Sequence, residues 1–255
     1  MTQSFNTPIF NTLSKKFTRN IYNTFKGKLR LAILERDFET LELHRSSLKV
    51  LDIGAGQGQF ATILAEKGHD LTLVEPAIEM LEIAKTRFSE KQLTGIFHHH
   101  FLEELPELNL PQYDLITCHA MLEWLPDPMQ FFEIVKPLLK KGGKLSLLFY
   151  NREGLIYHNL IRGNFHYVER GNFSGEKGGF TPISPIDPLT LESHLQHDYK
   201  ILKKSGIRTY YDFMNREARN RISEEDHLKM ELMYSERADY LPHARYLHWI
   251  LERVL

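Results

Sequence analysis

The sequence predicts an α/β fold in which a mostly parallel sheet lies between two layers of helices. Short apolar runs, typical of strands buried on both faces, recur along the chain and alternate with stretches of helical periodicity. Such alternation indicates βαβ units, whose strands are parallel because each crossover carries a helix. The length of 255 residues suits one domain of this class with additions.

Seven strands are expected, and the last should return antiparallel beside the sixth. The predicted strands are residues 49–53, 71–75, 95–100, 113–119, 144–150, 200–209 and 246–253. The helices predicted between them are residues 59–68, 78–89, 128–139 and 188–197. Residues 140–143 should form a turn, because paired glycines after a helix favour one.

The first strand runs into a glycine-rich turn, which is the most informative part of the chain. Gly54, Gly56 and Gly58 remove Cβ atoms where the backbone must bend tightly and a ligand can approach it. The helix that follows directs free N–H groups and its positive dipole end into this turn. The second strand ends on Glu75, which is 75 − 54 = 21 residues after Gly54. This layout is typical of a fold that grips an adenosine, with the acid accepting hydrogen bonds from ribose hydroxyls.

The spacing of the glycines favours one kind of nucleotide. Dinucleotide-binding folds carry G-x-G-x-x-G, whereas this chain has Gly54-Ala-Gly56-Gln-Gly58 after an acid, Asp52, in the strand. That form resembles the first motif of the Rossmann-like, S-adenosylmethionine-dependent methyltransferases. The resemblance implies that S-adenosylmethionine is the cofactor, that the turn supports its methionine part and that Glu75 holds its ribose. The alternatives are NAD binding and a glycine turn that binds nothing.

The composition argues against several classes of protein. A formal net charge of −1 argues against sequence-blind nucleic-acid binding through a broadly basic surface, although it leaves room for a local patch. The single cysteine, Cys118, allows no internal disulfide, fits a reducing compartment and should be a small core residue. No run approaches the roughly 18 apolar residues that a membrane span needs, and the first residues lack a secretory signal. We therefore expect a soluble cytoplasmic protein.

Three segments flank the expected cofactor-binding core of residues 46–150. Residues 1–45 should form a helical cap, in which Gly27 separates two helices or bends one. Residues 151–187 are rich in glycine, proline and aromatics and are expected to be irregular, whereas residues 212–243 are expected to be helical. The last two follow the carboxyl ends of strands, where ligands bind in such sheets, so we expect lid insertions on the substrate side.

The cap has a lopsided charge. Through residue 36 its helical part carries one acid, Glu35, and seven bases: Lys15, Lys16, Arg19, Lys26, Lys28, Arg30 and Arg36. These bases line either a solvated helix face or a phosphate-facing patch that also closes over the cofactor.

Other candidate residues stand at the ends of strands. Phe101 and Leu102, after the third strand, are expected either to surround the adenine or to pack in the core. His119 ends the fourth strand beside the glycine turn, so we expect it to contact the cofactor. Of the three consecutive histidines only His98 and His100 share a face, and no acid or cysteine completes a ligand set, so no metal is expected. No constellation suggests a covalent nucleophile.

Further motifs resemble one particular family. They are Lys16-Phe-Thr-Arg19-Asn-Ile-Tyr22, His119-Ala-Met-Leu-Glu123-Trp124, Leu145-Ser-Leu-Leu-Phe149-Tyr150-Asn151, Gly206-Ile-Arg208 and Ala244-Arg245-Tyr246-x-His248. On these motifs, which span nearly the whole chain, the sequence is similar to the tRNA 5-carboxymethoxyuridine methyltransferases. The resemblance implies cofactor contacts by Arg30, Gly54, Ala55, Gly56, Glu75, Phe101, Leu102 and His119. Glu75 stands where the family has Asp and Ala55 where it has Gly, and both keep the type of contact.

The resemblance also implies a reaction and a partner. The family esterifies the carboxylate of a modified uridine at the wobble position, so the anticodon loop of a tRNA is the implied partner. A carboxylate is ionised near neutral pH and needs no general base to attack a sulfonium methyl group, so no catalytic residue is expected. Arginines are the natural donors to hold that carboxylate, and the candidates are Arg19 and Arg208. Tyr150 and Asn151 are expected to position the base.

Contacts with the rest of the anticodon loop follow from the same resemblance. Four aromatic residues of the lid are expected either to form a stacking platform for splayed-out bases or to pack in the core: Phe165, Tyr167, Phe173 and Phe180. Phosphates are expected to meet the bases of the cap together with Arg152, Arg162 and Arg170. Two other functions stay open. One is a small-molecule methyltransferase, for example one acting on a quinone precursor, and the other is a module that binds S-adenosylmethionine or tRNA without chemistry.

Overall fold

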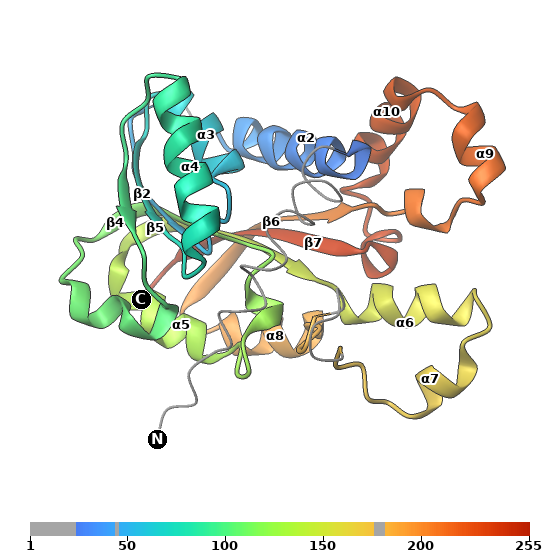
Figure 1. Cartoon of the computed structure of the whole chain (residues 1–255). Coiled ribbons are helices and arrows are strands. Elements are labelled where there is room, and N and C mark those ends of the chain that lie inside the picture. Colours follow the sequence, from blue (N-terminus) through green and yellow to red (C-terminus); the bar gives the residue numbers. More distant parts are fainter. Residues whose placement is uncertain (1–23, 44–45, 176–181) are drawn as a thin grey trace.

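The computed structural model describes residues 24–43, 46–175 and 182–255 and contains a seven-stranded sheet covered by helices (Figure 1). The spatial order of the strands is β3-β2-β1-β4-β5-β7-β6. The first five strands are parallel, and β7 runs antiparallel to both β5 and β6. The strands are β1 Lys49–Ile53, β2 Asp70–Val74, β3 Ile96–His98, β4 Tyr113–His119, β5 Leu139–Tyr150, β6 Tyr199–Ile207 and β7 Tyr246–Arg253. The predicted fold class is confirmed, including the antiparallel last strand.

Two layers of helices cover the two faces of the sheet because alternate strand residues point to opposite sides. Val50 packs under α2 (Phe25–Thr40), α3 (Gln59–Glu66) and α4 (Ile78–Glu90). Its neighbour Leu51 belongs to the opposite layer, which α5 (Gln130–Val135) and α8 (Pro188–Leu195) complete.

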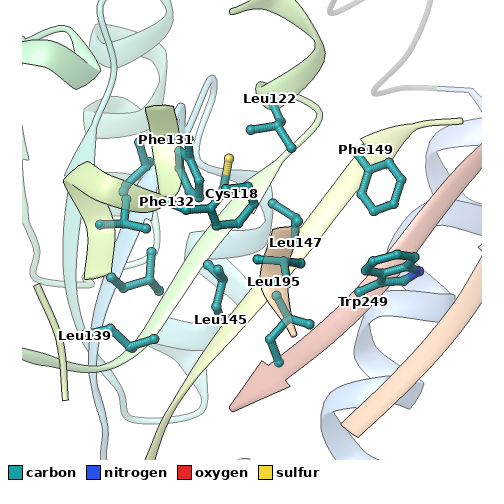
Figure 2. Packing of buried hydrophobic residues seen from close by; sticks show 14 of the residues in the cluster. Cys118, Leu122, Phe131, Phe132, Leu139, Leu145, Leu147, Phe149, Leu195 and Trp249 are labelled. Carbon is teal, nitrogen blue, oxygen red and sulfur yellow. The ribbon is translucent and has the colours of Figure 1, made fainter. Parts of the chain in front are cut away.

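The opposite layer holds the larger apolar core. Figure 2 shows Cys118 of β4 packed among Leu145, Leu147 and Phe131, and all four side chains are fully buried. Cys118 is therefore a small core residue, as expected. Trp249 of β7 packs edge-on against Phe149 of β5, with ring centroids 5.1 Å apart, so the antiparallel strand is part of this core.

The predicted turn at residues 140–143 lies inside β5 as a bulge. The pairing with β4 jumps from Leu139 opposite Tyr113 to Lys144 opposite Leu115, and the residues between leave the ladder. Gly142 has a φ of +75°, which favours glycine. The preceding helix is shorter than predicted because Pro137, which has no N–H to donate, lies in a 3-10 turn directly after it.

Helix α2 begins at Phe25, after Thr24, whose side chain accepts a hydrogen bond from Gly27 N. Gly27 thus lies in the first turn of α2 and does not bend it. Of the seven bases predicted in the cap, Lys15, Lys16 and Arg19 lie outside the described residues.

Three other bases of the cap hold residues 212–243 against α2. Lys26 pairs with Asp212 at 2.8 Å and Lys28 with Glu224 at 2.7 Å. Arg36 donates from Nη1 to Ser235 Oγ at 2.7 Å. These bases therefore join two parts of the chain. Neither the solvated helix face nor the phosphate-facing patch expected from the sequence included such contacts.

Both expected insertions lie at the same end of the sheet, beyond the carboxyl ends of β5 and β6 (Figure 1). Residues 151–187 were expected to be irregular, but they contain α6 (Arg152–Leu160) and α7 (Phe165–Glu169). For α6 a polar residue at the helix start explains this, since Asn151 caps the helix by accepting from Glu153 N at 3.1 Å. Residues 212–243 contain α9 (Arg216–Arg221) and α10 (Glu224–Tyr234), which agrees with their predicted helical character.

Candidate functional site

The glycine turn between β1 and α3 has a backbone that other residues rarely adopt. Gly54, Gly56 and Gly58 have φ values of +68°, +55° and +66°. A Cβ on Gly54 would lie 2.7 Å from Cγ of Met121, so the position is sterically closed as well. Gly54 N donates to Val74 O at 2.9 Å, which ties the turn to the end of β2. The turn therefore presents bare backbone at the carboxyl end of the sheet.

Glu75 lies directly behind this turn and is buried. Its Oε2 accepts a hydrogen bond from Gly56 N at 2.8 Å, and its Oε1 accepts one from Ala77 N at 2.9 Å. Each carboxyl oxygen keeps a second lone pair, so Glu75 can accept from a hydroxyl as well. Burial raises the pKa of Glu75 to about 7, despite the two N–H donors.

A second buried acid, Asp52, joins β1 to β4. Thr117 Oγ1 donates to Asp52 Oδ1 at 2.7 Å, and burial raises the pKa of Asp52 to about 6. Two acids with raised pKa values thus lie close to the glycine turn, in an environment that favours their protonated forms while no ligand donates to them.

A pocket opens on the α2 side of this turn. It is lined by Arg30, Leu31, Leu34, Asp52, Gly54, Ala55, Gln59, Phe60 and His119. Four of the residues expected to contact the cofactor therefore line one pocket: Arg30, Gly54, Ala55 and His119. Gly56, in the turn, and Glu75, behind it, are hydrogen-bonded to each other and are not part of this lining.

The other two expected cofactor residues, Phe101 and Leu102, stand apart from this lining. Phe101 is half-buried, and its backbone N donates to Glu104 Oε2 at 2.6 Å. Leu102 packs in the larger apolar core. Both lie just after β3, two strands away from β1 in the sheet, at its carboxyl edge.

His119 is fixed at the pocket wall. Its Nε2 hydrogen-bonds Ser146 Oγ at 2.8 Å, and its ring lies beside that of Phe60, with centroids 4.9 Å apart. Burial lowers the pKa of His119 well below its ordinary value, and the nearby charge of Arg30 acts in the same direction. The imidazole is therefore neutral at physiological pH.

Sequence reasoning missed part of the pocket lining. Gln59 and Phe60 belong to the first turn of the helix that follows the glycines, so their position next to the turn was a usable signal. Leu31 and Leu34 lie near Arg30 on one face of α2, which follows from helical spacing once α2 is known to cover the pocket.

A basic cluster lies beyond the pocket, at the carboxyl end of β6 and the start of β7. The guanidinium of Arg208 lies 3.4 Å from Asp212 and 5.2 Å from the ring centre of Tyr246. That of Arg245 lies 5.0 Å from the ring centre of Tyr150. Arg245 Nη1 is buried and has no hydrogen-bond partner within the described residues. Sequence reasoning did not single out Arg245, although it lies in one of the family motifs.

The remaining residues expected to bind substrate have different surroundings. Tyr150 is buried, with its ring edge-on to that of Tyr246 at 5.2 Å. Asn151 is fully buried, and its amide donates to Pro242 O and Ala244 O, each at 2.9 Å. Because its carbonyl oxygen also caps α6, the side chain of Asn151 is engaged within the chain. Arg19 lies outside the described residues.

Neither a metal-binding cluster nor a membrane-spanning helix is found among the described residues. Within residues 24–43, 46–175 and 182–255, no group of three or more His, Cys, Asp or Glu side chains is arranged to hold a metal ion. None of the helices in this part of the chain is both long and apolar enough to cross a membrane.

The chain's sequence and fold match those of known methyltransferases. Residues 51–147 match the family model of a methyltransferase domain. The magnesium protoporphyrin IX methyltransferase of Synechocystis PCC 6803, solved with bound SAH (S-adenosylhomocysteine), aligns with a TM-score of 0.64 at 14% identity, over 96% of this chain and 97% of that one. The fold, the glycine turn and these matches define an S-adenosylmethionine-dependent methyltransferase.

Curated relatives narrow the class. The tRNA 5-carboxymethoxyuridine methyltransferase of Escherichia coli K12 is 35% identical over 244 residues, which cover 94% of each chain. The chain belongs to the tRNA 5-carboxymethoxyuridine methyltransferase family. A ubiquinone biosynthesis O-methyltransferase of Haemophilus ducreyi is also 35% identical, but over only 149 residues, 56% of this chain and 61% of that one.

The contact of Gly54 with Met121 predicts a selective effect of Gly54→Ala. Gly68→Ala is the matched control, because Gly68 has a φ of +87° but no atom within 4 Å of the position that a Cβ would take. Both variants lose about 1–2 kcal/mol of unfolding free energy from left-handed strain. Gly54→Ala is expected to weaken S-adenosylhomocysteine binding by about tenfold or more, because overpacking displaces the turn. Calorimetric titration and urea unfolding measure both effects, and equal affinities for the two variants would contradict this function of the turn.

The raised pKa of Glu75 predicts a proton release on cofactor binding. Hydroxyl donors from the ribose favour the ionised carboxylate, so affinity for S-adenosylhomocysteine rises with pH up to about pH 7 and levels off above it, by up to about tenfold for each unit by which binding lowers the pKa of Glu75. The folding stability of the cofactor-free protein changes with pH in the opposite sense. Because the folded pKa of Glu75 exceeds its ordinary value, stability present below that ordinary value is lost as pH rises through about 7.

Calorimetry in buffers of different ionisation enthalpy measures this proton release. Glu75→Gln is the control, and its affinity is expected to vary less with pH. The pH dependence of the affinity is compared rather than the affinity itself, because the NH2 group of the introduced glutamine would face the N–H of Gly56 or Ala77 and weaken binding by itself. A flat pH profile for the unaltered protein would show that Glu75 does not hold the ribose.

Proposed function

We propose that this enzyme transfers the methyl group of S-adenosylmethionine to the carboxylate of 5-carboxymethoxyuridine at the wobble position of tRNA, giving 5-methoxycarbonylmethoxyuridine. The activity for which the Escherichia coli relative is named supports the substrate, since the similarity extends over 94% of both chains. The match therefore includes residues outside the methyltransferase domain of residues 51–147, in the segments that lie beyond the carboxyl ends of β5 and β6.

The observation that carries the proposal is the buried, unpartnered Nη1 of Arg245. A buried guanidinium nitrogen without an acceptor is costly, so it favours a ligand that supplies one. Arg208 and Lys26 lie in the same cluster, and both pair with one acid, Asp212. Three cations around one carboxylate leave an excess of positive charge, which suits an anionic substrate group. A fork-shaped guanidinium matches a carboxylate with two parallel hydrogen bonds.

Arg30 connects this cluster electrostatically with the cofactor pocket. It lines the pocket, and its charge acts on His119 there and on Tyr246 in the cluster. The charge of Arg30 therefore acts both on the wall of the pocket proposed for the methyl donor and on the cluster proposed to hold the anion. Tyr150 supports the arrangement as a neutral ring under Arg245, because burial raises the pKa of its hydroxyl.

The proposed reaction needs orientation and no proton transfer. A carboxylate oxygen attacks the methyl carbon, the carbon–sulfur bond breaks, and the electron pair stays on sulfur to give S-adenosylhomocysteine with a neutral thioether. The carboxylate is already ionised at neutral pH, so the protein aligns oxygen, carbon and sulfur and excludes water. The ester product has lost its negative charge, so the arginines hold it less strongly than the substrate and its release is favoured.

Residues 151–187 are the proposed surface for the anticodon loop. Phe165 on α7 is 57% exposed, as suits a residue that stacks on a splayed-out base. Tyr167 and Phe173 already pack edge-on against each other, with centroids 5.7 Å apart, so they are better suited to support this segment. Phe180 lies outside the described residues. Because Asn151 is engaged within the chain, the proposal gives it the role of capping α6 rather than holding the base.

Methyl transfer to two tRNA pools tests the function directly. One pool carries 5-carboxymethoxyuridine at the wobble position and the other lacks it, and labelled S-adenosylmethionine is the donor. We expect the methyl ester in the first pool only, identified by mass spectrometry of nucleosides. Transfer to neither pool, with S-adenosylhomocysteine still bound, would refute the tRNA substrate and favour a small-molecule acceptor such as a quinone precursor.

Arg208→Ala and Arg245→Ala are each expected to lower kcat/KM on the modified tRNA by about a hundredfold, because each removes a donor to a desolvated carboxylate. Arg245→Lys should recover only part of this loss, since lysine keeps the charge but not the fork. Lys200→Ala is the matched control, because Lys200 is an exposed cation at the opposite end of β6. Equal activity of all four variants would place the carboxylate elsewhere.

A further inference from the structure

A row of buried polar groups crosses the sheet from the cofactor pocket to helix α2. It starts at His119 of β4, whose Nε2 lies 2.8 Å from Ser146 Oγ of β5. The same Oγ lies 2.8 Å from His248 Nε2 of β7. His248 Nδ1 lies 2.6 Å from Asp37 Oδ2 of α2. Ser146, His248 and Asp37 are fully buried, so their hydrogen bonds are shielded from solvent in this structure.

The far end of this row is a charge-balanced group. Asp37 Oδ1 accepts a hydrogen bond from Arg36 Nη2 at 2.7 Å, and Lys203 Nζ lies 3.7 Å from the same oxygen. Glu236 pairs with both cations, at 3.1 Å from Arg36 Nε and 2.8 Å from Lys203 Nζ. Two carboxylates thus face two cations. The group is thus charge-balanced without a positive charge on the fully buried His248, and a cation there would lack a counter-charge.

In this charge-balanced arrangement, with one ring proton on His248, the direction of every hydrogen bond in the row is fixed. Asp37 is an ionised acceptor, so His248 Nδ1 carries the proton and donates to it. His248 Nε2 is then a bare acceptor, and Ser146 donates its only hydroxyl proton to it. Ser146 Oγ can then accept a hydrogen bond but has no proton left to donate. His119 Nε2 must therefore carry a proton and donate it to Ser146 Oγ. His119, which is neutral, is left with a bare lone pair on Nδ1.

We propose that Asp37, His248 and Ser146 are positioning residues that hold His119 as its Nε2–H tautomer, so that His119 Nδ1 accepts a hydrogen bond from the α-ammonium group of bound S-adenosylmethionine. His119 Nδ1 makes no hydrogen bond with the described part of the chain, and the half-buried ring lines the pocket. The inference rests on the cofactor pocket and is independent of the tRNA substrate.

The ammonium group is the donor of the cofactor that fits this acceptor. S-adenosylmethionine offers hydrogen-bond donors at its ribose hydroxyls, its adenine amino group and its α-ammonium group. The hydroxyls suit Glu75, behind the glycine turn. Arg30 on the pocket wall attracts the carboxylate of the methionine part, and the ammonium group is attached to the same carbon atom. A bare Nδ1 on His119 attracts the ammonium group. The opposite tautomer would direct its Nδ1–H at the ammonium group and repel it.

The tautomers can be observed directly by long-range proton–nitrogen correlation spectra of the full-length protein, with His119→Gln and His248→Gln used to assign the signals. We expect His119 to be protonated at Nε2 and His248 at Nδ1. Addition of S-adenosylhomocysteine, which keeps the ammonium group, should shift His119 Nδ1 and leave His248 unchanged. Protonation of His119 at Nδ1, or of both nitrogens of His248, would overturn the proposal.

Ser146→Ala tests the positioning role, because it breaks the row without touching the pocket. Affinity for S-adenosylhomocysteine should fall about threefold to tenfold, as expected for one hydrogen bond, and His119 should populate both tautomers. Thr72→Val is the matched control, since it also removes a buried strand hydroxyl but on β2. In a His119→Phe background, Ser146→Ala should cause no further loss of affinity.

The outcomes separate this inference from the proposed function. An unchanged affinity and tautomer in Ser146→Ala would refute the positioning role, and a further loss in the His119→Phe background would show an effect unrelated to His119. Failure of methyl transfer to tRNA would leave the cofactor affinities as expected. If Ser146→Ala does not fold, the tautomers of the unaltered protein decide the question.

Discussion

The arrangement of α2 over the sheet depends on one buried carboxylate, that of Asp37. It accepts hydrogen bonds from His248 of β7, from Ser205 of β6 and from its neighbour Arg36. These donors come from residues up to 211 positions away in sequence, so the carboxylate joins the start of the described chain to its last strand. Removal of any one partner would leave a buried charge incompletely compensated, which is among the most destabilising changes a protein can undergo.

The position of α2 in turn determines both parts of the site. Arg30 on its pocket-facing side completes the wall opposite the glycine turn. Lys26, one turn earlier, pairs with Asp212 and thereby orders the cluster that contains Arg208. A single helix therefore sets the distance between the cofactor pocket and the proposed acceptor site. Methyl transfer requires alignment within fractions of an ångström, so this common support has a chemical consequence.

The two parts of the site differ in their electrostatics. Asp52 and Glu75, beside the pocket, are acids that burial makes reluctant to ionise. Arg208 and Arg245 form the cluster beyond it, where positive charge is in excess. An acceptor that arrives already ionised needs such cations and no base, which agrees with a site whose chemistry consists of orientation.

Local sequence patterns predicted the parts of the fold that local forces determine. The strands, the glycine turn and Glu75 follow from apolar runs and glycine spacing within about 30 residues, the size of one βαβ unit. Arg245 and the row from His119 to Asp37 were not predictable in this way. They depend on β7 lying between β5 and β6, which brings Ser146 next to His248 across 102 positions of sequence. The helices α6 and α7 were missed because glycine and proline content outweighed the capping signal of Asn151.

The place of β7 in the sheet also orders events during synthesis of the chain. Within the described part of the chain, strand β6 has β7 as its only neighbour in the sheet, so β6 cannot join these strands while residues 246–253 are still inside the ribosome. The five parallel strands and the glycine turn can form earlier, because their contacts are closer in sequence. His248 and Arg245 enter with the last strand. The nascent chain therefore completes its parallel scaffold first and gains the groups proposed to orient cofactor and acceptor only when residues 245–253 have emerged.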